Sequence, residues 1–313
     1  MGAKRNWTPV TPLDLRAMKQ RGDRIVAVTA YDYTTAKVAD EAGCDLLLVG
    51  DSLAMVVLGY DSTLPVTMDE MLHHTKAVVR GSRRALVVGD LPFMSYHASV
   101  EEAVRNAGRF LKEAGAKAVK LEGAHSHQLA CISAIARSGI PVIAHLGFTP
   151  QSVHQIGQRV QAKTDAGIRE LLAQAEAVER AGACALVLEL VPAEVGALVT
   201  ERLSIPTIGI GAGVGCSGQI QVIHDLIGLY TDFMPRHAKR YAELHAAMVE
   251  AIATYAGDVR AGRFPSSEHS AHVELPERLS ACGKTTVTKS QSEANAQDVS
   301  RREIDHRNQQ QDP

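Results

Sequence analysis

Short runs of apolar residues recur along the chain without alternating polar positions. The clearest runs lie at 25–29, 46–49, 85–88, 118–121, 141–144, 185–190 and 206–210. Each is too short for a buried helix and lacks the alternation of a half-exposed strand, so each predicts a strand buried on both faces. An eighth strand is marked less clearly, and the best candidate is the segment 222–229.

Segments with helical features separate these runs. From Val100 onward the apolar positions keep a period near 3.6, which predicts an amphipathic helix covering a sheet. Several such segments end in a glycine just before the next run, and glycine commonly closes a helix in the left-handed conformation; these glycines are Gly43, Gly115, Gly139 and Gly182. Alternating strands and helices predict a parallel sheet, either an open doubly wound sheet or a closed barrel. A further short helix is expected at 12–19, ahead of the first strand.

Composition favours one catalytic domain with a large core. The chain has 313 residues, 45% of them hydrophobic, which suits a single (β/α)8 TIM barrel. We predict a catalytic barrel over residues 1–274. Residues 275–313 are polar and poor in apolar side chains, so we expect a disordered tail there.

Charge and cysteine content exclude several classes of protein. The 33 basic and 35 acidic residues nearly balance, so no nucleic-acid or membrane partner is expected, and small-molecule substrates are favoured. No apolar run approaches the length of about 20 residues that a membrane span needs, and no secretory signal is visible, which predicts a cytoplasmic protein. The five scattered cysteines indicate neither a disulfide framework nor a zinc site.

Polar side chains cluster at the carboxyl ends of the predicted strands, where barrel enzymes assemble their active sites. Asp51, Asp90 and Glu122 come from three successive strands. They are hard oxygen donors without an accompanying cysteine, which favours magnesium. An α-keto acid could chelate such an ion through its carboxylate and keto oxygens. The ion would then act as a Lewis acid and stabilise the enolate.

Other residues at the same strand ends fit the remaining roles. Glu189 lies among apolar residues, a setting typical of a general base. Lys120 could neutralise the substrate carboxylate or the enolate, and Ser52 could donate a hydrogen bond to that carboxylate. His145 could orient a ligand or assist the base. Taken singly, each acid could instead be a helix cap or a surface charge, and His145 could be a core histidine.

A glycine-rich segment follows the seventh predicted strand. Gly213, Gly215 and Gly218 match the dinucleotide-binding pattern G-x-G-x-x-G, but they follow six earlier strands and lack the acidic partner of that motif. We interpret the segment as a site of close backbone approach at the barrel mouth. Phosphate or pterin binding there remains open.

With these motifs the chain resembles the ketopantoate hydroxymethyltransferase family from about residue 29 to residue 269. The matching stretches are TAYDY (29–33), LVGDSL (48–53), TLPVT (63–67), GDLPFM (89–94), AVKLEG (118–123), HLGFTPQS (145–152), LELVP (188–192) and IGIGAG (208–213). The resemblance implies a barrel of the phosphoenolpyruvate/pyruvate type, a cytoplasmic enzyme and a homo-oligomer, typically a decamer. It also implies transfer of a hydroxymethyl group from 5,10-methylenetetrahydrofolate to 3-methyl-2-oxobutanoate, in pantothenate biosynthesis.

By the same resemblance, Asp51, Asp90 and Glu122 are expected to bind Mg²⁺. The keto acid is expected to contact Asp51, Ser52, Asp90 and Lys120, and Glu189 is expected to accept its proton. Two positions near the expected mouth depart from the family pattern, with Ala124 in place of a glycine and Ser217 in place of an acid.

Two other functions stay open at this level. One is a related magnesium-dependent aldolase or lyase that needs no folate. The other is a non-enzymatic metabolite-binding barrel in which the acids serve as caps.

Overall fold

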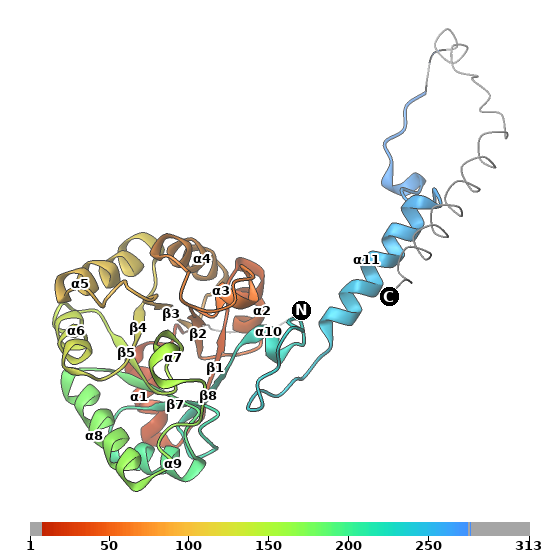
Figure 1. Cartoon of the computed structure of the whole chain (residues 1–313). Helices are drawn as coiled ribbons and strands as arrows, with labels where there is room; N and C mark the ends of the chain where they lie inside the picture. Colours follow the sequence, from red (N-terminus) through yellow and green to blue (C-terminus); the bar gives the residue numbers. More distant parts are fainter. Residues whose placement is uncertain (1–7, 275, 277–313) are drawn as a thin grey trace, which may run out of the picture. The chain divides into compact units, whose positions relative to one another are not determined.

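The computed structural model describes residues 8–274 and 276. Eight parallel strands form a closed barrel in the order β1 to β8, and β8 pairs with β1 (Figure 1). The strands are β1 (Ile25–Thr29), β2 (Leu46–Val49), β3 (Leu86–Asp90), β4 (Ala118–Glu122), β5 (Val142–Gly147), β6 (Ala185–Glu189), β7 (Thr207–Ile210) and β8 (Gly218–Gln221). The closed barrel and the first seven predicted strands are confirmed.

The predicted position of the eighth strand was wrong. Residues 222–229 contain the short helix α10 (Ile223–Leu226), whereas β8 begins at Gly218, the last glycine of the glycine-rich segment. Residues 218–221 alternate between buried and more exposed positions and contain only one large apolar side chain, Ile220. The segment therefore lacks the apolar run that marked the other strands, and its pairing with β1 and β7 defines it.

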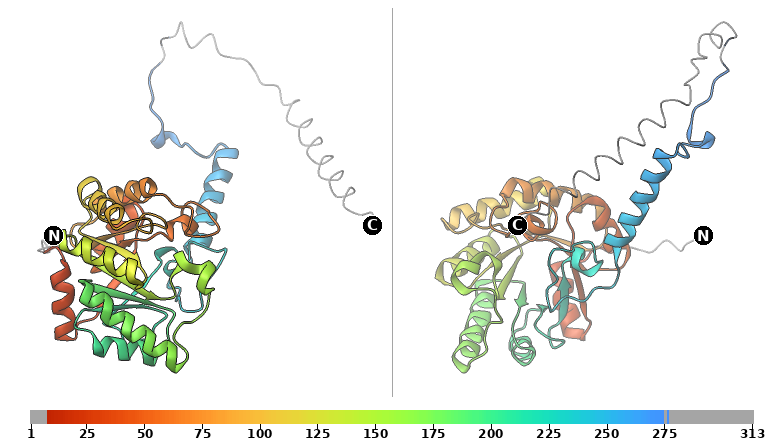
Figure 2. Two further views of the ribbon diagram at one scale, coloured as in Figure 1. Left: turned by 60° about the vertical axis from the view of Figure 1, so that its left-hand side comes forward. Right: turned by 45° about the vertical axis from the view of Figure 1, so that its right-hand side comes forward.

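Helices cover the barrel, most of them around the outside of the strands (Figures 1 and 2). They are α1 (Pro12–Arg21), α2 (Tyr33–Glu41), α3 (Leu53–Val56), α4 (Met68–Gly81), α5 (Val100–Arg109), α6 (Ser126–Arg137), α7 (Val153–Ile156), α8 (Asp165–Ala181) and α9 (Ala193–Arg202). A π-helical turn, Phe110–Ala114, extends α5, and a 3-10 turn, Pro150–Ser152, precedes α7. The four predicted helix-closing glycines all have positive φ angles.

The barrel has an inner core and an outer core. Along β2, Leu46 and Leu48 face the inner cluster, whereas Leu47 and Val49 pack in the outer cluster against the helices. This alternation follows from the period of two in a strand. Ala118 belongs to the inner cluster, so residues 120 and 122 of the same strand also point inward, but nearer the carboxyl end.

Helix α1 closes the amino end of the barrel. Its Leu15 is fully buried in the inner cluster. The Nζ atom of Lys19 donates hydrogen bonds to three backbone carbonyls, those of Thr200, Leu203 and Ile205, at 2.7, 2.7 and 2.9 Å. The open end of the barrel is therefore the carboxyl end of the strands.

The chain divides into a compact unit ending at Glu250 and a second unit beginning at Ala251. Helix α11 (Leu244–Arg260) crosses this boundary, and the second unit also contains the 3-10 turn Ser267–His269. No helix in the described residues is long and apolar enough to span a membrane. The predicted tail at 275–313 lies outside the described residues, apart from residue 276, and the domain boundary at 274 stays a prediction.

Candidate active site

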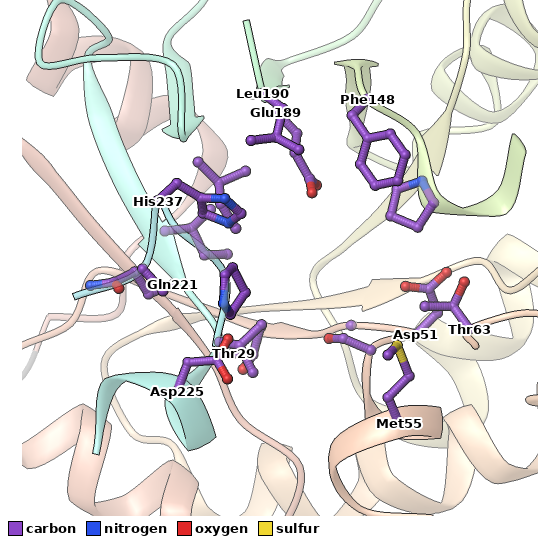
Figure 3. A pocket seen from close by; sticks show the side chains of 18 of the residues that line it. Thr29, Asp51, Met55, Thr63, Phe148, Glu189, Leu190, Gln221, Asp225 and His237 are labelled. Carbon is purple, nitrogen blue, oxygen red and sulfur yellow. The ribbon is translucent and has the colours of Figure 1, made fainter. Parts of the chain in front are cut away.

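A cavity of about 480 Å³ opens at the carboxyl ends of the strands. The seven residues predicted from sequence all line it, namely Asp51, Ser52, Asp90, Lys120, Glu122, His145 and Glu189. Figure 3 shows part of this wall, with Asp51 and Glu189 labelled. The barrel register explains why they meet, because Asp90 pairs with Lys120 and Glu122 pairs with His145 on the neighbouring strand.

Lys120 forms the centre of a buried group of charges. Its Nζ atom donates hydrogen bonds to both carboxylate oxygens of Asp90, at 2.8 and 2.9 Å, and lies 3.4 Å from Oε1 of Glu122. All three side chains are at most 4% exposed. Lys120 therefore compensates the charge of two buried carboxylates at once.

His145 lies between two acids. Its Nδ1 atom is 3.2 Å from Oε1 of Glu122, and its Nε2 atom is 3.3 Å from Oε2 of Glu189. Neither nitrogen has the alignment of a full hydrogen bond, so both are charge contacts. His145 is buried, whereas the Glu189 side chain is 15% exposed to the cavity. This arrangement links the predicted base to the buried carboxylates.

Gln151 and Tyr96 are two site residues for which no role was predicted from the sequence. The Nε2 atom of Gln151 donates to Oδ2 of Asp51 at 2.9 Å, and its backbone N–H donates to Oε2 of Glu122 at 3.0 Å. The Tyr96 hydroxyl donates to Oε1 of Gln151 at 2.7 Å. Gln151 thereby holds two carboxylates from different strands, a role that only the folded position of the 3-10 turn after β5 reveals.

Ser52 has a polar partner in Tyr31, which follows β1 at the mouth of the barrel. Its Oγ atom lies 2.8 Å from the Tyr31 hydroxyl. Burial raises the pKa of Tyr31 well above its usual value, so this phenol stays protonated. It can therefore hold the serine hydroxyl in a fixed orientation.

The site holds more negative than positive charge. Burial, followed by the charges of Asp90 and Glu122, raises the pKa of Asp51 well above its usual value. Burial also raises the pKa of Asp90, although Lys120 opposes this shift. Burial and the charge of Lys120 lower the pKa of His145. The Glu122 and Glu189 carboxylates raise it by a larger amount, so the pKa of His145 lies at about 9.

This donor set suits a hard divalent cation by its chemistry. Three carboxylates converge, and the raised pKa of Asp51 means that further positive charge would stabilise its ionised form. In the described residues, however, no three His, Cys, Asp or Glu side chains are arranged as a set of metal ligands. The amine of Lys120 and the amide of Gln151 instead contact the oxygens of Asp90 and Asp51.

The glycine-rich segment is used for packing. A β-carbon at Gly213 or Gly215 would clash with Ala193 or Ala197 of α9, and one at Gly218 would clash with the backbone of Ile25. None of the three glycines lines the cavity. The glycines do allow close backbone approach, but its predicted location at the mouth was wrong, because Gly213 and Gly215 pack against α9 and Gly218 pairs with Ile25 at the amino end of the barrel.

The two departures from the family pattern lie outside the cavity lining. The placement of Ser217 near the mouth was wrong, because it lies at the amino end of the barrel. There its Oγ atom accepts a hydrogen bond from the backbone of Thr207 at 3.3 Å, and its carbonyl accepts one from Ile25 at 3.1 Å. Ala124 packs against the outer core beyond the carboxyl end of β4.

A second wall of the cavity was not predicted from sequence. It comes from the end of β8 and the segment that follows, and it includes Gln221, Asp225, Tyr230, Phe233 and His237. In Figure 3, Gln221 and His237 lie on the opposite side of the cavity from Asp51 and Thr63. The cavity therefore has room beyond the cluster around Lys120.

Comparisons of the sequence with known proteins agree with one another. The family model described as ketopantoate hydroxymethyltransferase matches residues 9–267. A 3-methyl-2-oxobutanoate hydroxymethyltransferase of Chloroflexus aurantiacus is 60% identical over 274 residues, covering 88% of this chain and 97% of that protein. The enzyme of the same name from Moorella thermoacetica is 56% identical over 262 residues, covering 83% of this chain and 97% of that protein.

Solved structures share the fold at low sequence identity. A phosphoenolpyruvate phosphomutase from Streptomyces platensis subsp. rosaceus aligns with a TM-score of 0.56 and 16% identity, covering 94% of this chain and 99% of that one. A phosphonopyruvate hydrolase in complex with oxalate and Mg²⁺ aligns with a TM-score of 0.55 and 15% identity, covering 83% and 93%. At this identity, the likeness extends to the barrel fold alone.

Proposed function

Because the chain belongs to the ketopantoate hydroxymethyltransferase family, we propose that it transfers a hydroxymethyl group from 5,10-methylenetetrahydrofolate to 3-methyl-2-oxobutanoate. The products would be ketopantoate and tetrahydrofolate, in pantothenate biosynthesis. The observation that carries this proposal is the cavity in which a partly exposed carboxylate, Glu189, faces a buried cluster of three carboxylates and one lysine.

The keto acid would bind beside Asp51, Ser52 and Asp90. The carboxylates Asp51, Asp90 and Glu122 would hold Mg²⁺, which when bound would supply Lewis-acid polarisation of the keto oxygen. Lys120 would attract the negative charge of the substrate, and the Ser52 hydroxyl would donate a hydrogen bond to the substrate carboxylate.

Glu189 would accept the proton from C3 of the keto acid. Its carboxylate is open to the cavity and touches only one charged neighbour in the described residues, His145. The charge contact with His145 would hold the carboxylate in one orientation while leaving an oxygen for the substrate. The resulting C3 carbanion equivalent would attack the methylene carbon of the donor, and the new carbon–carbon bond would replace one of its two carbon–nitrogen bonds to folate. Water would replace the other and supply the hydroxyl oxygen, and the C3 proton and one proton of the water would pass to the two folate nitrogens.

The cavity size supports a reaction with two substrates. Small-molecule sites commonly have volumes of roughly 300–1,000 Å³. The cavity of about 480 Å³ exceeds the needs of a branched five-carbon acid. The part of the cavity next to its second wall, which includes Gln221 and His237, would accommodate a ring system of the donor.

The proposal also includes a cytoplasmic homo-oligomer, with a decamer as the family expectation. Helix α11 supports assembly because Met248, Ile252, Tyr255 and Val259 recur at helical spacing and are 44–62% exposed. Exposed apolar side chains in such a row favour burial against another copy. Light scattering coupled to gel filtration would give the mass of the assembly, and a monomer at micromolar concentration would contradict this part.

The test of the activity separates its two halves. Exchange of the C3 proton of 3-methyl-2-oxobutanoate, followed by NMR in deuterated buffer with and without Mg²⁺, reports proton removal alone. Formation of ketopantoate on addition of 5,10-methylenetetrahydrofolate reports transfer. We expect both activities to require Mg²⁺. Proton exchange together with a product that forms from formaldehyde without folate would favour the aldolase alternative. The absence of both exchange and transfer would contradict the proposal.

A single substitution tests the assignment of Glu189 as the base. Glu189→Gln should lower the exchange rate by about 10²- to 10⁴-fold, the usual contribution of a positioned base. Glu194→Gln is the matched control, because Glu194 is exposed in the first turn of α9. Equal exchange rates in Glu189→Gln and the wild type would remove Glu189 from the mechanism.

A further inference from the structure

Asp225 is a buried carboxylate that the mechanism above does not use. It lies in α10, lines the cavity and is 6% exposed. Among residues 8–274 and 276, its side chain forms no hydrogen bond and no ion pair. The cation that interacts with it electrostatically, Arg240, forms an ion pair with Glu243 at 3.1 Å. The Asp225 oxygens are not among the buried polar atoms that lack a partner, and the residue lines the cavity, so the carboxylate is open to the cavity and free to accept hydrogen bonds from a ligand there.

The position of Asp225 is fixed by its backbone surroundings. The N–H of Ile223 donates to Oγ1 of Thr29 at the end of β1, at 2.9 Å. The carbonyl of Asp225 accepts from Gly228 at 3.2 Å, and the carbonyl of Leu226 accepts from Tyr241 at 2.8 Å. The carboxylate is therefore presented from an anchored turn, in a geometry suited to a ligand.

Asp225 is ionised at neutral pH despite its burial. Burial raises its pKa, and the charge of Arg240 opposes this rise, so the pKa lies at about 6. Two carboxylate oxygens are then available as acceptors within the cavity. A ligand that presents two adjacent N–H donors in one plane would satisfy both oxygens.

The rest of this wall is suited to a flat ring. Tyr230, Phe233 and His237 line the cavity with Asp225, and they supply aromatic surface. In Figure 3, Asp225 lies near Thr29, away from Asp51 and Thr63 on the opposite wall. A ring bound to Asp225 would therefore leave the cluster around Lys120 free for the keto acid.

We propose that Asp225 binds the pteridine ring of the one-carbon donor, by accepting hydrogen bonds from its N3–H and its 2-amino group. This inference rests on the proposed function, because it names where the second substrate of that reaction binds. The 2-amino-4-oxo edge of the pteridine is the part of the donor that carries two neighbouring N–H donors. The keto acid has no N–H group to donate to Asp225, so we expect it to bind at the other wall.

The test compares tetrahydrofolate with its 2-desamino-2-methyl analogue, which lacks one of the two donors. In the wild type, with the keto acid and Mg²⁺ present, calorimetry should show a dissociation constant about tenfold higher for the analogue. In Asp225→Asn, tetrahydrofolate should bind about 10- to 100-fold more weakly, and the difference between the two ligands should disappear. Asp232→Asn, a change at an exposed site seven residues away, is the matched control and should bind both ligands as the wild type does.

The outcomes distinguish this inference from the proposed function. Wild-type protein that forms ketopantoate but binds both ligands equally would overturn the role of Asp225 and leave the activity intact. The same conclusion would follow if Asp225→Asn kept the wild-type preference. Wild-type protein without folate-dependent product would overturn both. The comparison of ligands on the wild type needs no variant, so a folding defect in Asp225→Asn cannot obscure the result.

Discussion

The Nε2 atom of His145 lies 3.3 Å from Oε2 of Glu189, and this contact joins a buried imidazole to a carboxylate that faces the cavity. Because His145 also contacts Glu122, the imidazole connects the predicted base to the predicted magnesium ligands. We interpret His145 as a positioning residue that acts through Glu189.

His145→Gln should therefore lower the rate of C3 proton exchange, on the order of 10²-fold, because a misplaced catalytic group costs about this much. The KM for the keto acid should change far less, since His145 acts on the base. Exchange rates measured against substrate concentration separate the two effects. His125→Gln, at an exposed position, is the control. A rise in KM without a fall in rate would assign His145 to substrate binding.

Lys120→Met should destabilise the metal-free protein by about 3–5 kcal/mol, because it leaves the buried carboxylates of Asp90 and Glu122 without their cation. Thermal unfolding should show a lower Tm than for Lys117→Met, the same change at an exposed position. Saturating Mg²⁺ should raise the Tm of Lys120→Met more than that of the wild type. An equal response to Mg²⁺ in both proteins would argue against a metal site at these carboxylates.

Asp51 and Asp90 should respond differently to neutralisation in the metal-free protein. The pKa of Asp51 is raised, so its ionised form is disfavoured in the folded state, and Asp51→Asn should leave the Tm unchanged or raise it. Asp90→Asn removes the main partner of Lys120 and should lower the Tm. Both variants should lose Mg²⁺-dependent exchange. Equal destabilisation by the two changes would show that Asp51 carries no excess charge.

Gly147 is a backbone position on which the geometry of the base depends. It has a φ angle of +90°, and a β-carbon there would clash with the carbonyl oxygen of Glu189. Gly147→Ala should therefore shift the end of β6, lower the stability and reduce the exchange rate. Gly139→Ala has a similar φ angle of +83° but open space around it, so it should show only the strain of about 1–2 kcal/mol. Similar loss of exchange in both variants would indicate general backbone strain.

The KM for the folate donor should depend on the ionisation of Asp225. Because its pKa is raised to about 6, the carboxylate is mostly ionised at pH 7 and mostly protonated at pH 5. The KM should therefore rise about tenfold as the pH falls between these values. Arg240, Tyr31 and Tyr230 also interact electrostatically with Asp225. Burial raises the pKa of both tyrosines, so neither phenol titrates in this range. The KM of Asp225→Asn should not change with pH in this way. An equal rise of KM in the variant would show that another group causes the pH dependence.

The apolar runs along the chain determined seven strands and the class of the fold, because a strand buried on both faces needs a continuous apolar segment. The position of acids directly after those runs was enough to predict Asp51, Asp90 and Glu122, since parallel strands bring their carboxyl ends together. The eighth strand was misplaced because residues 218–221 carry little apolar surface and are held by pairing with β1 and β7.

Tertiary structure alone decided the contacts between segments far apart in sequence. Gln151 reaches Asp51 across 100 residues, and Ser217 lies at the amino end of the barrel despite following the seventh strand closely. Asp225 differs from any surface acid only by its burial beside the cavity. Local sequence specifies periodicity and strand ends, whereas the partners and burial of a side chain depend on closure of the barrel. That closure is a property of all eight strands together.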